Sequence, residues 1–182
     1  MRKTLFVFLV AAMFEGLGFS QARLNLTELK QDTHVFERIV DERVKLNFTN
    51  PFAITGSPQA SYMQGYGVMV TFRLRIDRGK IRLPFGEIDA PNKLNKVAVK
   101  KKIEKVRKIL SDCLATHAGS IKQLGAHDRI SISAHIEDRN ELDPIKRRRV
   151  LVITTTKDDA DLLAMRKITQ DEFMKRLHVL DY

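Results

Sequence analysis

The clearest hydrophobic pattern in the chain is an alternation of apolar and polar residues between positions 68 and 77. Such a period of two predicts a half-buried strand. The turn-forming residues 64–67 precede it, so we expect residues 60–76 to form two strands around a tight turn. Arg73 and Arg75 fall on the polar face, which we expect to meet water or a partner.

Three later segments are also typical of strands. Residues 129–137 alternate between apolar residues and a polar set that contains Ser131, Ser133 and His135. Residues 149–156 combine an apolar run with three threonines, which have high β-propensity. Residues 177–180 are a short final candidate.

Helical periodicity marks two long segments and two short ones. Residues 27–48 carry apolar side chains at three- and four-residue steps, with Thr27 as the expected N-cap and Asn50-Pro51 as the stop. We expect a second long helix from Asn92 to about Leu124. A short helix through Met165 should begin at Asp158 or Asp159, and Thr169–Glu172 is a capping-box pattern for another. Residues 51–58 and 77–92, which contain proline and glycine, are expected to be loops.

This order of elements predicts an α+β fold. We expect two layers, with an antiparallel or mixed sheet of about four strands and the helices packed on one face. The polar opposite face of two strands supports that arrangement.

The N-terminus has the organisation of a secretory signal peptide. Arg2 and Lys3 precede an apolar run that ends near Phe14, and Ser20-Gln21-Ala22 has small residues where a signal peptidase needs them. We therefore predict a signal peptide over residues 1–22, cleaved between Ala22 and Arg23, and a single domain over residues 23–182. The protein would be exported, to the periplasm or beyond, with no membrane-spanning helix after cleavage. An uncleaved anchor or a buried helix is the alternative.

Composition narrows the class of protein. The chain has 182 residues, 43% of them hydrophobic, which excludes a disordered chain. Its single cysteine excludes an intramolecular disulfide framework and a cysteine-rich zinc module. The formal net charge is +10.

Positive charge is concentrated in two clusters. The predicted second long helix has many lysines on its polar side, and a run of basic residues follows residue 145. These clusters favour binding of an anionic envelope polymer or lipid, or of a protein partner; a solvated helix face and a charged loop are the alternative. Export and the lack of interleaved aromatic residues argue against nucleic acid. The candidate binding residues are Lys100, Lys101, Lys102, Lys105, Lys108, Arg147, Arg148 and Arg149.

Catalytic signals are weak. Ser133 and His135 share the polar face of one predicted strand, and Asp128 lies just before it, so a hydrolase site can be drawn there. No nucleophile elbow or paired-histidine metal motif accompanies it. Cys113 falls on the apolar stripe of the predicted helix and is expected to be a buried side chain. We predict no catalytic residue, no metal site and no cofactor.

One segment resembles a known group of proteins. Residues 61–70, with an aromatic strand, the Gly65-Tyr66-Gly67 turn and an apolar strand, are similar to a signature of uncharacterised exported bacterial proteins. The pattern of residues 157–173 resembles their C-terminal ending. This resemblance implies a bacterial source and an envelope location, and it implies no activity, cofactor or site residue.

The sequence thus favours an exported, non-enzymatic protein that binds an anionic envelope component or a protein partner through basic surfaces. Two alternatives stay open. One is the hydrolase at Ser133, His135 and Asp128. The other is an assembly subunit that pairs through a sheet edge or through the face of Arg73 and Arg75.

Overall fold

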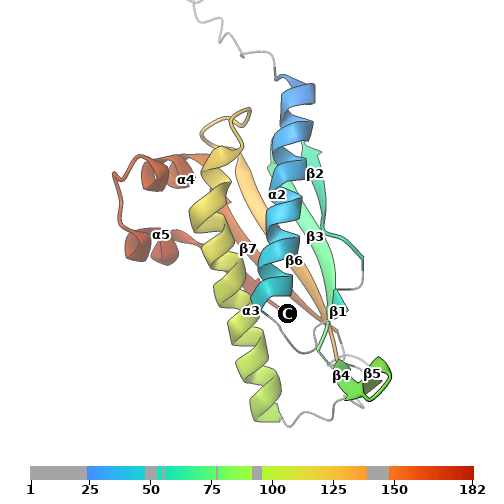
Figure 1. The fold of residues 1–182 in the computed structure, drawn as a ribbon. Coiled ribbons are helices and arrows are strands. Elements are labelled where there is room, and N and C mark those ends of the chain that lie inside the picture. The colour runs from blue at the N-terminus through green and yellow to red at the C-terminus, as the bar shows by residue number, and fades with distance from the viewer. Residues whose placement is uncertain (1–23, 48–52, 55, 77, 92–95, 139–147) are drawn as a thin grey trace, which may run out of the picture.

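A mixed β-sheet forms one layer of the molecule, and its six strands occupy five positions (Figure 1). The structure, a computed structural model, describes residues 24–47, 53–54, 56–76, 78–91, 96–138 and 148–182. Two strands, β1 (Ala53–Ile54) and β2 (Gln59–Met63), pair with the same edge of β3 (Gly67–Arg75). The order continues through β6 (Arg129–Glu137) and β7 (Arg148–Thr156) to β8 (His178–Asp181).

The central pairing of this sheet is parallel. β3 lies beside β6 in the register Gly67 to Arg129, whereas the other neighbouring strands are antiparallel. Parallel neighbours need a crossover connection. Here the crossover carries a separate hairpin, β4 (Arg78–Leu83) and β5 (Gly86–Pro91), and then the helix α3 (Lys96–His117).

Helices cover one face of the sheet. α2 (Leu26–Asn47) and α3 lie side by side across it, and α3 continues into the short 3-10 helix η1 (Ala118–Ser120). α4 (Lys157–Ala164) and α5 (Gln170–Arg176) extend this helical layer beside α3 (Figure 1). Within the described ranges, no helix is long and apolar enough to cross a bilayer.

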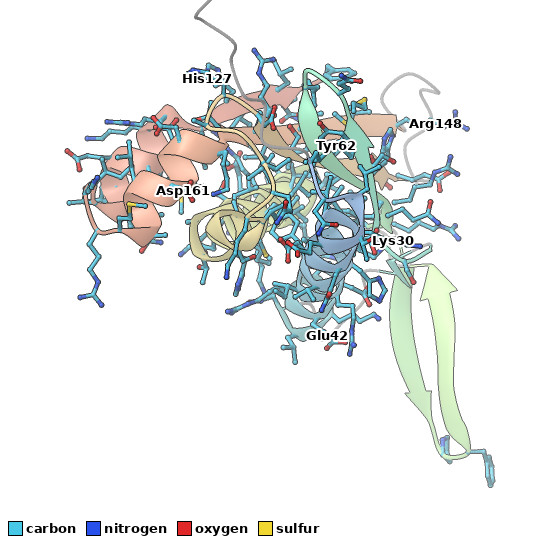
Figure 2. The ribbon with its side chains drawn as sticks, turned by 90° about the horizontal axis from the view of Figure 1, so that it is seen from above. Lys30, Glu42, Tyr62, His127, Arg148 and Asp161 are labelled. Carbon is cyan, nitrogen blue, oxygen red and sulfur yellow. The ribbon has the colours of Figure 1, made fainter. Side chains whose placement is uncertain are left out.

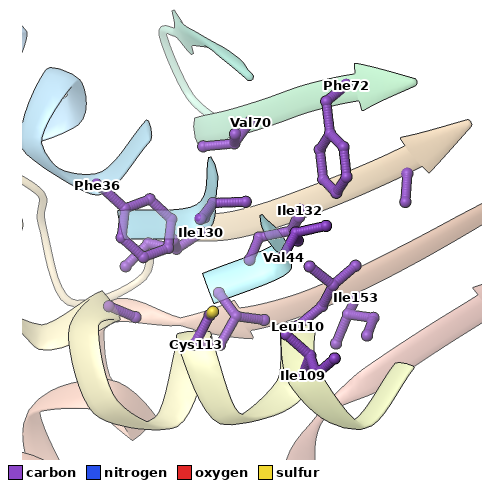
Figure 3. Close-up of a cluster of buried hydrophobic side chains, with 14 of the residues drawn as sticks. Phe36, Val44, Val70, Phe72, Ile109, Leu110, Cys113, Ile130, Ile132 and Ile153 are labelled. Atoms are coloured by element: carbon purple, nitrogen blue, oxygen red, sulfur yellow. The ribbon is translucent and has the colours of Figure 1, made fainter. Parts of the chain in front are cut away.

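The core lies between the sheet and the two long helices (Figure 3). Phe36 and Val44 of α2 and Leu110 and Cys113 of α3 meet the apolar row of the strands. The same cluster takes in Phe173 of α5, which is fully buried. This packing fixes the sheet, and with it the positions of side chains on the opposite face.

The opposite face of the sheet is polar at its centre. The Tyr66 hydroxyl lies 2.6 Å from Ser131 Oγ, which lies 2.8 Å from Thr154 Oγ1. Ser131 is fully buried, and this chain of hydrogen bonds meets the requirement that a buried hydroxyl be paired.

These observations confirm the α+β class and the two-layer arrangement, with a sheet five strands wide rather than about four. The predicted pair of strands within residues 60–76, the strands near residues 129–137 and 149–156, and the short last strand are all present. The capping box of Thr169 and Glu172 is present as well.

Several predicted details were wrong. Residues 78–91 form a hairpin rather than a loop, because both segments alternate apolar and polar residues around a Pro84-Phe85 turn. Asn25 caps α2 in place of Thr27: its Oδ1 accepts from the backbone N–H of Thr27 at 3.1 Å.

Two helix boundaries also differ from the prediction. α4 begins at Lys157, one residue before Asp158, and the hydroxyl of its N-cap Thr156 accepts the N–H of Asp159. α3 ends at His117, seven residues before Leu124. The predicted stop at Asn50-Pro51 and the predicted cap at Asn92 lie outside the described residues.

Candidate functional site

A cleft of about 380 Å³ lies at the edge of the sheet where β3 and β6 end and β7 begins. Four of its lining residues are arginines. Two arginines come from β3 and two from β7, with His135 and Glu137 of β6 between them. The lining contains four guanidinium groups and one carboxylate, which leaves a formal excess of three positive charges among these groups. The lining residues are Arg73, Arg75, His135, Ile136, Glu137, Arg148, Arg149 and Val150.

Strand register explains why these residues meet. Arg73 pairs across the sheet with His135, and His135 pairs with Val150. Two residues further along, Arg75 pairs with Glu137, and Glu137 pairs with Arg148. Since side chains two apart on a strand share a face, Arg73, Arg75, His135, Glu137 and Arg148 all lie on the face that the helices leave uncovered.

Carboxylates hold two of the four arginines. Arg75 is buried, and its Nε lies 3.7 Å from Glu137 Oε2. Arg149 donates to both carboxylate oxygens of Asp181 on β8, with Nη2 to Oδ2 at 2.7 Å. The hydrogen bonds to Asp181 raise the pKa of Arg149, which keeps its charge fixed. These pairs shape the wall of the cleft.

The other two arginines, Arg73 and Arg148, are exposed. They stand two strands apart across the sheet and two residues apart along it, which places their backbones about 12 Å from each other. Two extended guanidinium groups can converge over that span on one phosphate or carboxylate group. Planar guanidinium groups bind such anions through paired hydrogen bonds. The arrangement is suited to anion binding.

The lysines predicted as binding residues all lie on α3, between residues 100 and 108. Lys100, Lys101, Lys105 and Lys108 are exposed, while Lys102 is half-buried. Lys105 Nζ donates to the backbone carbonyl of Asn47 at 2.6 Å, at the end of α2. Most of this lysine cluster therefore faces solvent.

The lysine cluster and the arginine cleft are at the same end of the molecule. Glu104 of α3 acts electrostatically on Arg149, and Asp138, next to Glu137, acts on Lys102. Burial lowers the pKa of Lys102, and the charge of Asp138 opposes that shift. Arg147, the remaining predicted binding residue, lies outside the described residues.

The residues of the hydrolase hypothesis do not come together. Ser133 and His135 share a face of β6, as predicted. Asp128 precedes the other end of that strand, so its backbone is roughly 20 Å from that of His135. Its carboxylate instead accepts the backbone N–H of Gly125 at 2.8 Å. Ser133 is buried, so a substrate has no access to its hydroxyl group.

Two other sets of reactive side chains have structural roles. Cys113 is buried among apolar side chains, and burial raises its pKa to about 11. Asp159 forms an ion pair with Arg176 at 2.8 Å, and Asp161 pairs with Lys157. Among the residues that the structure describes, no three histidine, cysteine, aspartate or glutamate side chains are grouped as metal ligands.

A second cleft, of about 450 Å³, lies between α2 and the end of α3. Val35, Ile39 and Leu46 line it, together with His117 and Arg43. Burial lowers the pKa of His117, and the positive charge of Arg43 lowers it further. This cleft is mainly apolar and offers no concentration of charge comparable to that of the arginine cleft.

The members of the arginine cleft could be recognised in the sequence, but their grouping in one cleft could not. Arg73 and Arg75 were placed on a polar strand face, and Arg148 and Arg149 in a basic run. Their meeting depends on β6 lying between β3 and β7, which alternation does not reveal. Glu137 was expected on the same polar strand face as His135, but it was not named as a site residue.

Comparison with known proteins gives no relative: no protein family, curated protein or solved structure matches the chain. The candidate function therefore depends on the geometry and charge of the molecule itself.

Proposed function

We propose that this protein is an exported, non-enzymatic binding protein that captures an anionic component of the cell envelope. The arginine cleft would bind phosphate or carboxylate groups of a polymer or a lipid headgroup. The lysines of α3 would attract the same ligand over a longer range. The signal-peptide pattern of residues 1–22 supports export.

The observation that carries this proposal is the pair of exposed arginines in the cleft. Arg73 and Arg148 flank His135, whereas Arg75 and Arg149 have carboxylates beside them. A ligand with an anionic group can therefore gain two charged contacts without breaking either internal pair. Arginine side chains supply donors only, so the complementary ligand is an acceptor-rich anion.

A titration with fluorescently labelled polyphosphate tests the proposal. We expect binding at low salt that weakens steeply as the salt concentration rises, because screening reduces attraction between exposed charges. In the double variant Arg73→Gln and Arg148→Gln, we expect affinity to fall roughly tenfold or more and the salt dependence to flatten. Polygalacturonate in a parallel titration shows whether carboxylates are bound as phosphates are.

A matched control removes two positive charges elsewhere. Lys122 follows η1 and Lys167 follows α4, so each is separated from the cleft by the length of α3 or of β7. Both are exposed. The double variant Lys122→Gln and Lys167→Gln should retain nearly all binding. Equal losses in the two double variants would mean that overall charge, rather than the cleft, attracts the polymer, and would refute the proposed site.

A further inference from the structure

The β4–β5 hairpin is an arm that projects away from the body of the molecule (Figure 2). Its two strands pair with each other and form a sheet separate from the main one. Each strand has six residues, so the arm is about 20 Å long. An isolated two-stranded hairpin is marginally stable in water. We therefore expect another surface to pack against this arm and stabilise it.

The register of the arm pairs residues of matching chemistry. Ile81 is opposite Ile88, whereas Lys80 is opposite Asp89 and Arg82 is opposite Glu87. The register thus pairs apolar residues with each other and charged residues with residues of opposite charge. Residues of opposite charge at paired positions favour this register.

The tip of the arm is apolar. Phe85 is fully exposed at the turn between the strands, next to Pro84 and Gly86. Because the Phe85 ring lies at the end of a projecting hairpin, it can be buried only by contact with a surface of another molecule.

Positive charge lies close to the base of the arm. β5 ends at Pro91, and α3, with the exposed Lys100, Lys101 and Lys105, begins at Lys96. β3 leads into the arm just after Arg73 and Arg75 of the cleft. The apolar tip thus extends from the cationic end of the molecule, a combination that suits a membrane surface with anionic headgroups.

We infer that the β4–β5 arm inserts its apolar tip, with Phe85, into the interface of an anionic phospholipid bilayer. The basic residues at its base then meet the headgroups. The inference rests on the proposed function for the electrostatic attraction, and it names the lipid bilayer as the partner.

A single tryptophan can report this insertion, because the chain contains none. We would place it with Phe85→Trp in the full chain and add vesicles of equal parts phosphatidylglycerol and phosphatidylcholine. The expected result is a shift of the emission maximum to shorter wavelength, with quenching by brominated acyl chains. Tryptophan suits a bilayer interface, so the substitution should preserve insertion.

The matched control is Met165→Trp. Met165 is an exposed apolar residue at the end of α4, a helix that lies far from the arm in Figure 2. The emission of this variant should stay unchanged when vesicles are added. This expectation also holds if residues 1–22 tether the chain to the vesicles, because tethering would bring the protein near the bilayer without burying residue 165. Equal shifts in the two variants would overturn the inference.

Two further outcomes would also overturn it. If the emission of the Phe85→Trp variant does not shift while polyphosphate still binds, the proposed function stands and the arm has no membrane role. If that emission shifts without vesicles and in proportion to protein concentration, the arm docks on a second copy. Conversely, a shift with vesicles and no polyphosphate binding would support the arm and refute the cleft.

Discussion

Replacing Gly67 with alanine tests the parallel pairing at the centre of the sheet. Gly67 is the first residue of β3, has a φ of +119°, and pairs with Arg129. A Cβ atom added there would meet the carbonyl oxygen of Arg129 at 2.1 Å and its nitrogen at 2.6 Å. Both neighbours are backbone atoms, which cannot rotate away as a side chain can.

Three effects then lower the free energy of unfolding. Alanine at this φ costs about 1 to 3 kcal/mol. Forcing a methyl group into packed structure costs about 1 to 3 kcal/mol more. Moving Arg129 away also weakens the hydrogen bond from its N–H to the carbonyl of Tyr66, 2.7 Å long, which is worth about 1 kcal/mol.

Gly65→Ala is the matched control. Gly65 lies in the same turn with a φ of +78°, and an added Cβ would find nothing within 4 Å. It should show the backbone strain alone, so we expect Gly67→Ala to be destabilised by about 2 kcal/mol more than Gly65→Ala. In urea denaturation, that difference corresponds to a midpoint lower by roughly 1 M. Equal midpoints for the two variants would refute the close approach of β3 and β6.

Three other predictions concern buried groups. Phe173→Ala removes a fully buried ring of α5 and should cost about 3 to 5 kcal/mol in urea denaturation; a loss below about 1 kcal/mol would show that α5 is not part of the core. Cys113, with its pKa raised to about 11 by burial, should react slowly with dithiobis(nitrobenzoate) in the native protein and fast in urea, and rapid native labelling would contradict its burial. His117 has a pKa below its ordinary value, so the unfolded chain takes up a proton there more readily than the folded one. Stability should therefore fall as pH drops from about 6.5 toward the folded-state pKa, and His117→Gln should reduce that slope in thermal melts at successive pH values.

Most elements of the fold could be predicted because each is encoded locally. The alternation around Phe72 and the capping box at Thr169 are patterns within a few residues. The parallel placement of β3 beside β6 is not local, since it joins residues separated by α3 and the arm. The arm was missed because its proline and glycine residues signalled a loop more strongly than its short alternating runs signalled strands.

The candidate site could likewise be predicted only where it depends on local sequence. Basic residues are visible in a sequence, so Arg148 and the lysines of α3 were named in advance. Which of them share a surface depends on strand order, and which of them remain available to a ligand depends on carboxylates such as Asp181. Asp181 lies 32 residues after Arg149, so charge counting along the chain could not show that this arginine is already paired.

The position of the arm between β3 and α3 has a consequence for how this molecule can diversify. No strand of the main sheet belongs to residues 78–91, so the hairpin is topologically an insertion in a connection rather than a member of the framework. Exchanging this hairpin for one of another length or composition would leave the register of every framework strand intact. The body can thus serve as a constant scaffold, while the inserted hairpin is varied independently of it.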